Sequence, residues 1–421
     1  MADSIKSVIT CDMDGKIETF GEGSEQMFGY TPEEVIGKQR VSVFSPGLVV
    51  LGPLMGWLKT ASIEGEYEGD TVFLDKAGKK FAAHIRITPT LKDGKQIGFC
   101  GVTTPLEDTT VESVEPEIGF MTRMFKWLVI TRAPFLTATI VPVLLGGAVA
   151  SWLGFPVSLG LLGLTLLAAI LLHLGTNTAN DYFDHRSGTD EATYDYIVPF
   201  TGGSRSIQMG LISARGMLTL SLVFFALAAL AGIPLVLRVG TPLLVLGIVG
   251  ALSGFFYTAP PLRLAARKGL GELLVALNFG PLIVAGSTLV QTGSIEPLAL
   301  LAGVPVGLLT AAILWINEIP DISGDKSTGK NTLVAVLGGA RARYGYLVLV
   351  VGAFAVIAAT ALLGIFPLIS LVALLGAYLA VKATGTLFEH YAGPGLKPAN
   401  AGTINLHLVT GLLLTIGYWV G

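Results

Sequence analysis

Two polar segments, each at the end of a long apolar stretch, carry asparagine and aspartate at helical spacing. In the first segment the residues are separated by four and then three positions, and in the second by four and four. Side chains at these intervals lie on one face of a helix. In chain order the residues are Asn177, Asp181, Asp184, Asn317, Asp321 and Asp325.

These six side chains offer amide and carboxylate oxygens, and neither segment adds Cys to the set. Oxygen ligands suit Mg²⁺, which proteins usually hold through a few carboxylates together with substrate phosphates. Acidic groups at a membrane edge are costly unless they are paired or bind an ion. We therefore expect Mg²⁺ as the cofactor, all six residues as its ligands, and a diphosphate as the substrate.

The composition is that of an integral membrane protein, with 52% hydrophobic residues, 14% charged residues and a mean hydropathy of +0.68. Only the first hundred or so residues resemble a soluble domain. From about residue 128 onward, apolar stretches are long enough for membrane helices. The nine stretches lie near 133–152, 158–176, 214–237, 240–257, 271–291, 296–317, 344–364, 366–382 and 403–420.

The basic residues of the membrane region are concentrated in alternate loops. The loops after the second, fourth, sixth and eighth stretches carry nearly all of them, whereas the opposite loops offer only Arg238. Since basic loops stay inside, we expect a multi-pass protein of the cytoplasmic membrane with its N-terminus and both Asp-rich segments on the cytoplasmic side. The start of the chain lacks the apolar core of a signal peptide. We expect the lipid bilayer as a partner and no nucleic acid.

Residues 1–108 alternate short β-like runs with turn signals such as Asp14-Gly15 and Asp93-Gly94, which predicts a small antiparallel sheet. Between the second and third runs, Thr31 is placed to cap a helix, with Glu34 completing a capping box. The run "FGYTPEEVIGK" and the order of two strands, helices and three strands resemble the PAS sensory fold. The fold class that we expect for this domain is α+β.

PAS folds bind haem, flavin, a small metabolite or nothing. The single His of this domain, His84, lies in a predicted strand, which favours an ordinary sheet histidine over a haem ligand. We expect the domain to act through an unidentified ligand or a protein partner, with a non-sensing remnant as the alternative. Residues 109–127 are an acidic linker followed by an aromatic and basic segment that suits a short interfacial helix.

Residues 128–421 look like the UbiA superfamily of intramembrane aromatic prenyltransferases. The resemblance implies an all-α membrane bundle of nine helices, with two Asp-rich motifs that bind Mg²⁺ and the isoprenyl diphosphate on opposite sides of a cavity. Within the superfamily the motifs are most similar to the 1,4-dihydroxy-2-naphthoate prenyltransferases of menaquinone synthesis. The motifs are "NTANDYFDHRSGTD" at 177–190, "TGGSRSIQMGLIS" at 201–213, "YTAPPLRL" at 257–264, "GLGELLVALNFGPL" at 269–282 and "NEIPDISGDKSTGKNTL" at 317–333.

The first motif departs from the commoner superfamily pattern, because Gly188 stands at its third acidic position and the next acid is Asp190. The naphthoate branch shares this shorter form. Basic and amide side chains in the motif segments suit diphosphate oxygens, as forked donors or point charges. We expect Asn177, Asn180, Arg205, Asn317, Lys326 and Lys330 to bind substrate.

An allylic cation needs aromatic faces and exclusion of water, and Tyr257 is the best candidate for such a face. We count it as catalytic together with Asp181, Asp184, Asp321 and Asp325. Glu272 and Asn278 either orient the acceptor or, for Glu272, cap a helix. His173, one turn before the first motif, either lines the site or makes a bond between helices.

The sequence thus predicts transfer of a polyprenyl chain from a polyprenyl diphosphate to an aromatic acceptor, 1,4-dihydroxy-2-naphthoate, with release of diphosphate and CO₂. The alternative acceptors are 4-hydroxybenzoate, homogentisate, a chlorophyllide or a glycerol lipid. A rival of another class is a PAS-linked membrane sensor or cation transporter. Such a protein would place its acidic groups near mid-membrane instead of at one edge beside Arg and Lys.

Overall fold

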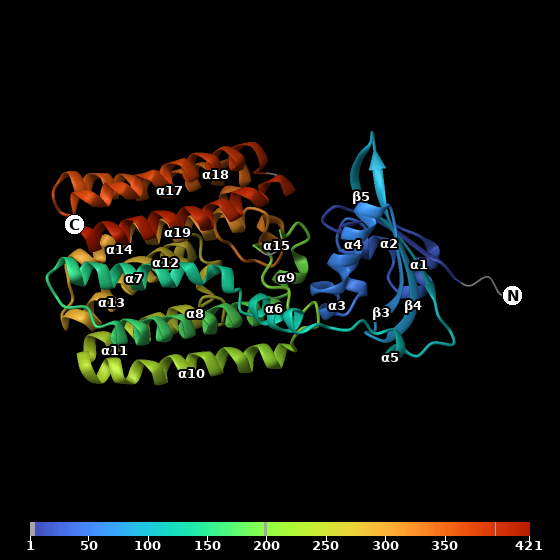
Figure 1. The fold of residues 1–421 in the computed structure, drawn as a ribbon, viewed down its shortest axis with the longest axis horizontal. Helices are drawn as coiled ribbons and strands as arrows, with labels where there is room; N and C mark the ends of the chain where they lie inside the picture. The colour runs from blue at the N-terminus through green and yellow to red at the C-terminus, as the bar shows by residue number, and fades with distance from the viewer. Residues whose placement is uncertain (1–4, 198–199, 392) are drawn as a thin grey trace. The chain divides into compact units, whose positions relative to one another are not determined.

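The computed structural model describes residues 5–197, 200–391 and 393–421. The chain forms two compact units (Figure 1). The first comprises Met1–Ile130 together with Arg205–Ser213, and the second comprises Thr131–Ser204 together with Ala214–Gly421. All named strands belong to the first unit, and the second consists of helices and their connections.

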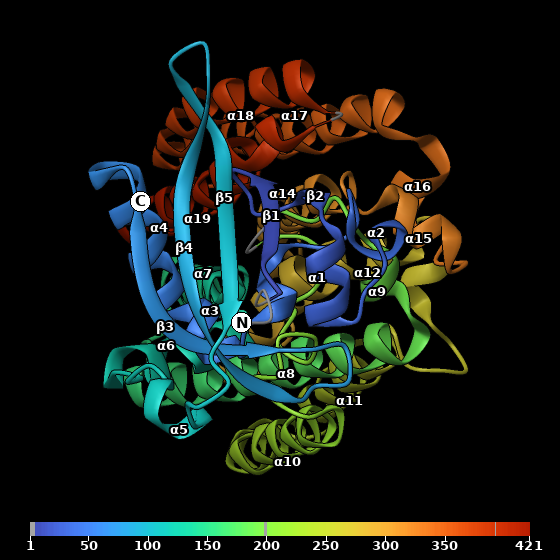
Figure 2. The same ribbon diagram turned by 90° about the vertical axis from the view of Figure 1, so that its right-hand side faces the viewer.

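A five-stranded antiparallel sheet forms the centre of the first unit, in the order β2-β1-β5-β4-β3 (Figure 2). The predicted antiparallel sheet is therefore confirmed. The long β4–β5 hairpin turns at Asp93-Gly94, where both residues have positive φ, as a tight hairpin requires. The strands are β1 Ser7–Asp12, β2 Ile17–Phe20, β3 Tyr67–Leu74, β4 Lys80–Lys92 and β5 Lys95–Pro105.

Short helices connect the second and third strands, and the predicted capping box is present because the backbone N–H of Thr31 donates to Glu34 Oε2 at 3.0 Å. An aromatic core lies under the sheet, with the rings of Phe28 and Phe44 only 4.3 Å apart. His84 pairs with Asp70 across β4 and β3 at 2.7 Å. The helices of this unit are α1 Glu22–Phe28, α2 Pro32–Val35, α3 Gly47–Leu51, α4 Pro53–Glu64, α5 Val111–Val114 and α6 Phe120–Ile130.

The second unit is a helical bundle. Among the described residues of this unit, eight helical segments are long and apolar enough to span a membrane, and a further apolar helix, α11, is shorter at Thr241–Phe255. The remaining elements are α7 Thr137–Trp152, α8 Leu159–Ser187, α9 Thr189–Ala192, α10 Ala214–Val239, α12 Leu270–Leu277, α13 Ile283–Thr292, α14 Pro297–Glu318, α15 Ile322–Ser327, α16 Leu333–Leu337, α17 Gly339–Leu362, α18 Ala377–His390 and α19 Lys397–Val420.

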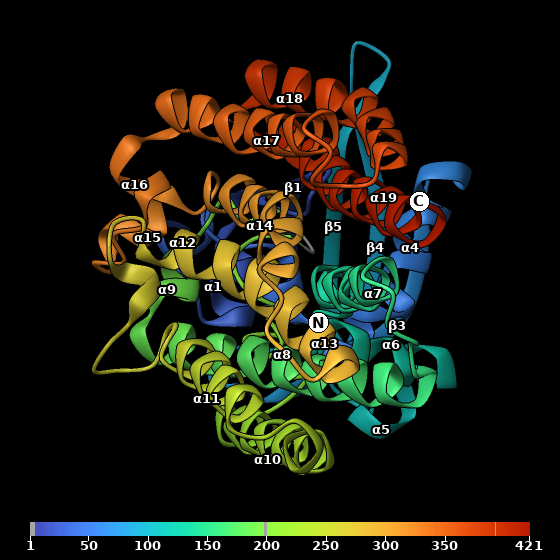
Figure 3. The same ribbon diagram turned by 90° about the vertical axis from the view of Figure 1, so that its left-hand side faces the viewer.

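Helix α14 lies in the interior of this bundle, while α10 lies at its edge (Figure 3). A π-helical turn at Asn278–Leu282 joins α12 to α13, and α14 packs directly against it. A Cβ atom on Gly280 would collide with the carbonyl oxygen of Gly303. Small residues therefore allow the close helix approach that packing in lipid requires.

Candidate active site

The first Asp-rich motif lies on the last turns of α8, as the spacing predicted. The helix ends at Ser187, and Gly188 caps it: the positive φ of 76° at Gly188 lets its backbone N–H donate to carbonyls of the last turn. Asp181 and Asp184 are 3% and 8% exposed. Asn177, Asn180 and Asp184 line a cavity of the second unit. Asp181 is directed elsewhere, toward the turn that follows α9.

The second motif does not lie on one helix, so the predicted continuous helical spacing is wrong here. Asn317 belongs to the last turn of α14, but that helix ends at Glu318, and Asp325 lies in the separate helix α15. Pro320 explains the break, since it has no N–H to donate to the carbonyl four residues earlier. Asp321 occupies the residue before α15. The three side chains nevertheless line the same cavity.

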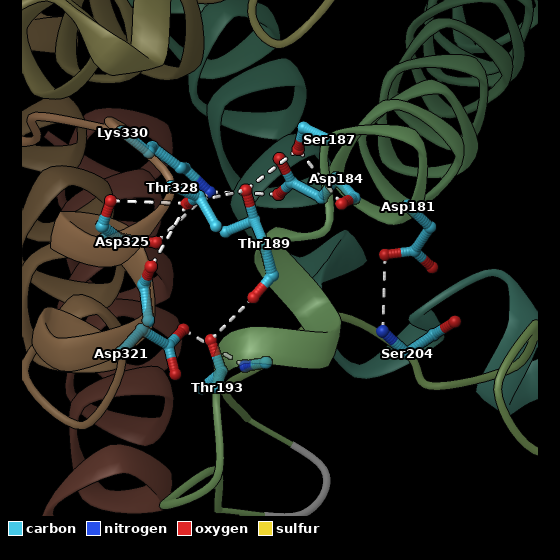
Figure 4. A network of polar contacts seen from close by, with 12 residues as sticks. Asp181, Asp184, Ser187, Thr189, Thr193, Ser204, Asp321, Asp325, Thr328 and Lys330 are labelled. Atoms are coloured by element: carbon cyan, nitrogen blue, oxygen red, sulfur yellow. Dashed lines mark hydrogen bonds and ion pairs between the residues drawn. The ribbon is translucent and has the colours of Figure 1, made fainter.

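Lys330 joins the two motifs (Figure 4). Its Nζ lies 2.9 Å from Asp184 Oδ2 and 3.8 Å from Asp325 Oδ1. Burial disfavours the charged amine, but these two carboxylates outweigh it and hold the pKa of Lys330 well above its ordinary value. Burial raises the pKa of Asp325 to about 7, against the opposing effect of Lys330. Lys330 therefore lies between the two motifs, and its role in binding diphosphate stays a prediction.

The turn at Gly202–Ser204 also connects the two motifs. The backbone N–H of Gly202 donates to Asp321 Oδ2 at 3.0 Å, and that of Ser204 donates to Asp181 Oδ1 at 3.2 Å. Gly203, between them, has a φ of +72°. A Cβ atom there would lie 3.0 Å from both carboxylate oxygens of Asp190 and 3.2 Å from Asp181 Oδ1. Only glycine fits this turn without displacing the acidic groups.

Tyr257 lines the cavity, as does Asn278, which accepts a hydrogen bond from Ser253 at 3.3 Å. Burial, together with the charge of Glu318, raises the pKa of the Tyr257 phenol well above its ordinary value. Glu272 has the capping role, because its Oε1 accepts from the backbone N–H of Leu333 at 2.6 Å, at the start of α16. Tyr257 therefore offers a neutral phenol to the cavity.

Two predicted substrate-binding residues are not placed at the cavity. Lys326 is exposed and is not a lining residue among those the structure describes. Arg205 belongs to the segment assigned to the first unit, so its role stays a prediction. His173 lines the cavity, and its Nδ1 lies 2.7 Å from Thr139 Oγ1.

Sequence reasoning missed two charged side chains of the cavity, Arg132 and Glu318. Arg132 Nη1 lies 3.9 Å from Asp181 Oδ1. Glu318 is 8% exposed, and its Oε2 has no hydrogen-bond partner in the described part of the chain. The position of Glu318 directly after Asn317 was the available signal. Arg132 precedes the first membrane stretch and belongs to no motif.

The cavity has a polar end and apolar walls. Its volume is about 270 Å³. The motif residues, Lys330 and Arg132 form the polar end, and hydrophobic side chains of α7, α8, α11, α13 and α14 form the walls. The wall residues include Ala138, Leu172, Leu246, Phe279, Leu282 and Ile313. This arrangement suits a ligand with an anionic head and a long hydrocarbon tail.

The residues present fit Mg²⁺ only with help from a substrate. Among the described residues, no three His, Cys, Asp or Glu side chains are grouped closely enough to hold a metal ion by themselves. Asp181 Oδ2, however, is a buried carboxylate oxygen without a hydrogen-bond partner in the same part of the chain. Mg²⁺ commonly takes one or two carboxylates and completes its shell with phosphate oxygens and water. Paired carboxylates with a diphosphate match that pattern.

Comparison with known proteins identifies the class. The model of the UbiA prenyltransferase family matches residues 139–391, and that of a PAS domain matches residues 5–110. The chain is 31% identical to the 1,4-dihydroxy-2-naphthoate octaprenyltransferase of Escherichia coli over 71% of this chain and 97% of that one. The chain therefore belongs to the UbiA prenyltransferase family, and it carries an N-terminal PAS domain.

Further relatives agree with this class. The chain is 28% identical to the 2-carboxy-1,4-naphthoquinone phytyltransferase of Synechocystis, over 70% of this chain and 94% of that one. Among solved structures, a UbiA homolog from Archaeoglobus fulgidus bound to DMAPP and Mg²⁺ matches with a TM-score of 0.51 at 17% identity, covering 69% of this chain and 99% of that one. The protein is a multi-pass membrane prenyltransferase.

Proposed function

We propose that this prenyltransferase moves a polyprenyl chain from a polyprenyl diphosphate to 1,4-dihydroxy-2-naphthoate, with release of diphosphate and CO₂. The observation that carries the proposal is the meeting of both Asp-rich motifs at the polar end of an apolar-walled cavity. Lys330 and the Gly202–Ser204 turn link the two motifs at that end. The choice of acceptor is supported by the relative from Escherichia coli, whose name states that acceptor.

We propose that Mg²⁺ is held by the carboxylates of Asp181, Asp184, Asp321 and Asp325 with the amide oxygen of Asn177. When bound, Mg²⁺ neutralises the negative charge that develops on a leaving diphosphate. Lys330 and Arg132 contribute positive charge of the protein's own at the same end of the cavity. Charges fixed in advance and shielded from water stabilise a leaving anion strongly.

The walls of the cavity protect the cation that remains when diphosphate leaves. The aromatic rings of Tyr257 and Phe279 both line the cavity. An aromatic face attracts a cation without reacting with it as a base would. The surrounding aliphatic side chains exclude water, which would otherwise capture the cation as an alcohol.

The acceptor loses CO₂ in place of a proton, so the ring needs no base to become aromatic again. The allylic C–O bond breaks, and a new C–C bond forms at the ring carbon that bears the carboxylate. The carboxylate then leaves as CO₂, and its bonding electrons restore the aromatic ring. The net reaction requires no strong protein base.

The test presents the purified full chain with Mg²⁺ and a polyprenyl diphosphate, with naphthoate and 4-hydroxybenzoate offered in parallel. We expect a prenylated naphthalenediol and one CO₂ for each diphosphate. Product from 4-hydroxybenzoate alone would overturn the acceptor while leaving the prenyltransferase class intact. Homogentisate, a chlorophyllide and a glycerol lipid are further arms of the same assay.

We also propose that the PAS domain regulates or localises the enzyme, through a protein partner or an unidentified ligand. The active face and the N-terminus lie in the cytoplasm in this proposal, since the basic loops accompany the Asp-rich segments. Labelling of a cysteine substituted at the exposed residue Lys326, in intact cells and in opened membranes, tests the orientation. Reaction with an impermeant reagent in intact cells would contradict it.

A further inference from the structure

The two asparagines of the Asp-rich motifs present different atoms to the cavity. Asn177 and Asn317 occupy equivalent places in their motifs, and both line the cavity. A carboxamide is planar, with its oxygen and its NH₂ group pointing in different directions from one carbon. Whichever atom is bonded to the protein scaffold therefore leaves the other for a ligand.

Asn317 is held by Asn400, a residue of α19 that is fully buried. Asn400 Nδ2 donates to Asn317 Oδ1 at 2.7 Å and to the backbone oxygen of Ile316 at 3.4 Å. Asn400 is not a lining residue of the cavity, as far as the described residues show. The oxygen of Asn317 is thus directed toward α19.

Pro320 explains why Asn400 takes this orientation. In a continuous α-helix the carbonyl of Ile316 would accept from the N–H of residue 320, but proline has none. A carbonyl oxygen can only accept, so the group of Asn400 that faces it must be the NH₂. The same NH₂ then requires an acceptor from Asn317, which is Oδ1. The reversed arrangement would set two oxygens against each other.

The amide of Asn177 is oriented by a different neighbour. Its Nδ2 donates to the backbone oxygen of Thr131 at 3.4 Å, which again can only accept. With its NH₂ group held by this carbonyl, the amide oxygen of Asn177 and its two lone pairs point away from Thr131. Asn177 therefore keeps its oxygen available as a ligand.

Asn317 keeps its hydrogens available instead. Among the described residues, the side-chain hydrogen bond of Asn317 runs through Oδ1 to Asn400, and its Nδ2 donates to no described residue. We propose that Asn317 donates from Nδ2 to an anionic oxygen of the bound diphosphate and is not a metal ligand, with Asn400 as the positioning residue that fixes this orientation. The inference deepens the proposed function and rests on diphosphate as the substrate.

The roles of the two motifs therefore differ. The first motif contributes an amide oxygen for the cation, and the second contributes an amide donor for the leaving group. A hydrogen bond to a charged oxygen that strengthens as diphosphate departs favours the chemical step as well as binding. The sequence alone predicted the same ligand role for both residues.

Asn→Asp substitutions separate the two roles, because aspartate keeps a ligand oxygen and loses the donor. Affinity for the unreactive probe farnesyl thiolodiphosphate is measured in the reconstituted full chain at saturating Mg²⁺, together with the Mg²⁺ concentration that gives half-maximal turnover. We expect Asn317→Asp to lower the affinity for the probe by roughly 10- to 100-fold without raising the Mg²⁺ concentration that gives half-maximal turnover. Asn177→Asp should retain probe affinity within about threefold.

Unchanged probe affinity in Asn317→Asp would overturn the proposal, and so would a raised Mg²⁺ requirement with unchanged probe affinity. An increase confined to the KM of the naphthoate would assign the donor to the acceptor carboxylate and likewise overturn it. Asn331→Asp is the matched charge control, since Asn331 is exposed and lies outside the cavity lining.

The positioning role of Asn400 is tested by a double-mutant cycle. Asn400→Leu should lower the affinity for the probe in the wild-type background and should cause no further loss of affinity in an Asn317→Ala background. Equal effects in both backgrounds would show a merely structural role and refute the positioning. Asn405→Leu is the matched control, since Asn405 is an exposed residue of the same helix. Probe binding requires no acceptor, so this test gives a clear result even if the acceptor assignment is wrong.

Discussion

Substitution of Gly203 by alanine tests whether the turn between the motifs holds the acidic groups in place. The new Cβ would lie 3.0 Å from both oxygens of Asp190 and 3.2 Å from Asp181 Oδ1, which is closer than carbon and oxygen normally approach. The φ of +72° also disfavours any residue with a Cβ, by roughly 1–2 kcal/mol. Both effects force the turn away from the carboxylates.

The consequence for the site follows from the bonds that the turn makes. Moving it by a few tenths of an ångström breaks the 3.2 Å bond from Ser204 to Asp181 and strains the 3.0 Å bond from Gly202 to Asp321. A hydrogen bond to a charged group contributes about 1.5–3 kcal/mol, which corresponds to roughly 10- to 150-fold. We expect Gly203→Ala to lower kcat/KM for the polyprenyl diphosphate by at least about tenfold.

Gly364→Ala is the matched control for backbone strain. Gly364 has a nearly equal φ of +71°, but a Cβ there meets nothing within 4 Å. Gly364→Ala should lose only the stability that the strained φ costs, Gly203→Ala should lose at least as much, and only Gly203→Ala should lose activity. A Gly203→Ala enzyme with wild-type kcat/KM and Mg²⁺ dependence would refute the reasoning about the turn.

Four further outcomes are expected. The double variant Asp181→Asn Asp321→Asn should abolish prenyl transfer without altering the melting temperature, and EDTA should likewise abolish transfer by the wild-type enzyme. Near wild-type turnover in the double variant would exclude both residues as metal ligands. Lys330→Met should lower stability as well as turnover, because it leaves two buried carboxylates without their partner; thermal melts at neutral pH check this, and an unchanged melt contradicts it. Deletion of residues 1–118 should leave a competent bundle, and a truncated enzyme that inserts correctly yet transfers nothing would assign the PAS domain to the catalytic unit. Burial raises the pKa of the Cys11 thiol from 9.0 to about 11. The stability that the buried, protonated thiol contributes is therefore complete below pH 9 and is lost as the pH rises from 9 to about 11. Near neutral pH, alkylation of Cys11 in the native chain should be limited by unfolding, and rapid alkylation would show that the core is open.

The sheet and the membrane spans could be predicted because their signals are local. Turn pairs such as Asp93-Gly94 mark the hairpins, and uninterrupted apolar stretches mark the spans. The break in the second motif was also readable, since Pro320 stands three residues after Asn317. The spacing of the acidic residues predicts one continuous helix, but Pro320 removes a backbone donor inside it, so that prediction is wrong.

The contacts that decide the orientation of site residues could not be predicted in the same way. Asn400 meets Asn317 across 83 residues of sequence, and Leu333 meets Glu272 across 61. Helix packing brings these pairs together, and no local pattern marks either partner. Glu272 illustrates the difficulty, because its sequence position allows a capping role but does not show which helix it caps. The structure shows that it caps the start of α16.

The charge balance of the site gives a physical reason for binding the cation and the diphosphate together. Among the described residues, the carboxylates of Asp184, Asp321 and Asp325 line the cavity, and the basic side chains that line it are Arg132 and Lys330. Asp181 adds a further carboxylate beside Arg132. The excess of negative charge repels a diphosphate that arrives alone. A divalent cation removes this excess, and the diphosphate then supplies the oxygens that the paired carboxylates lack. Burial is the main cause that raises the pKa of Asp325 to about 7, and the negative charges of Asp321 and Asp184 act in the same direction. Mg²⁺ and diphosphate should therefore bind with positive coupling, so each should lower the half-saturating concentration of the other by the same factor. Titration of farnesyl thiolodiphosphate at several Mg²⁺ concentrations measures that factor, and a probe affinity independent of Mg²⁺ would contradict this account of the site.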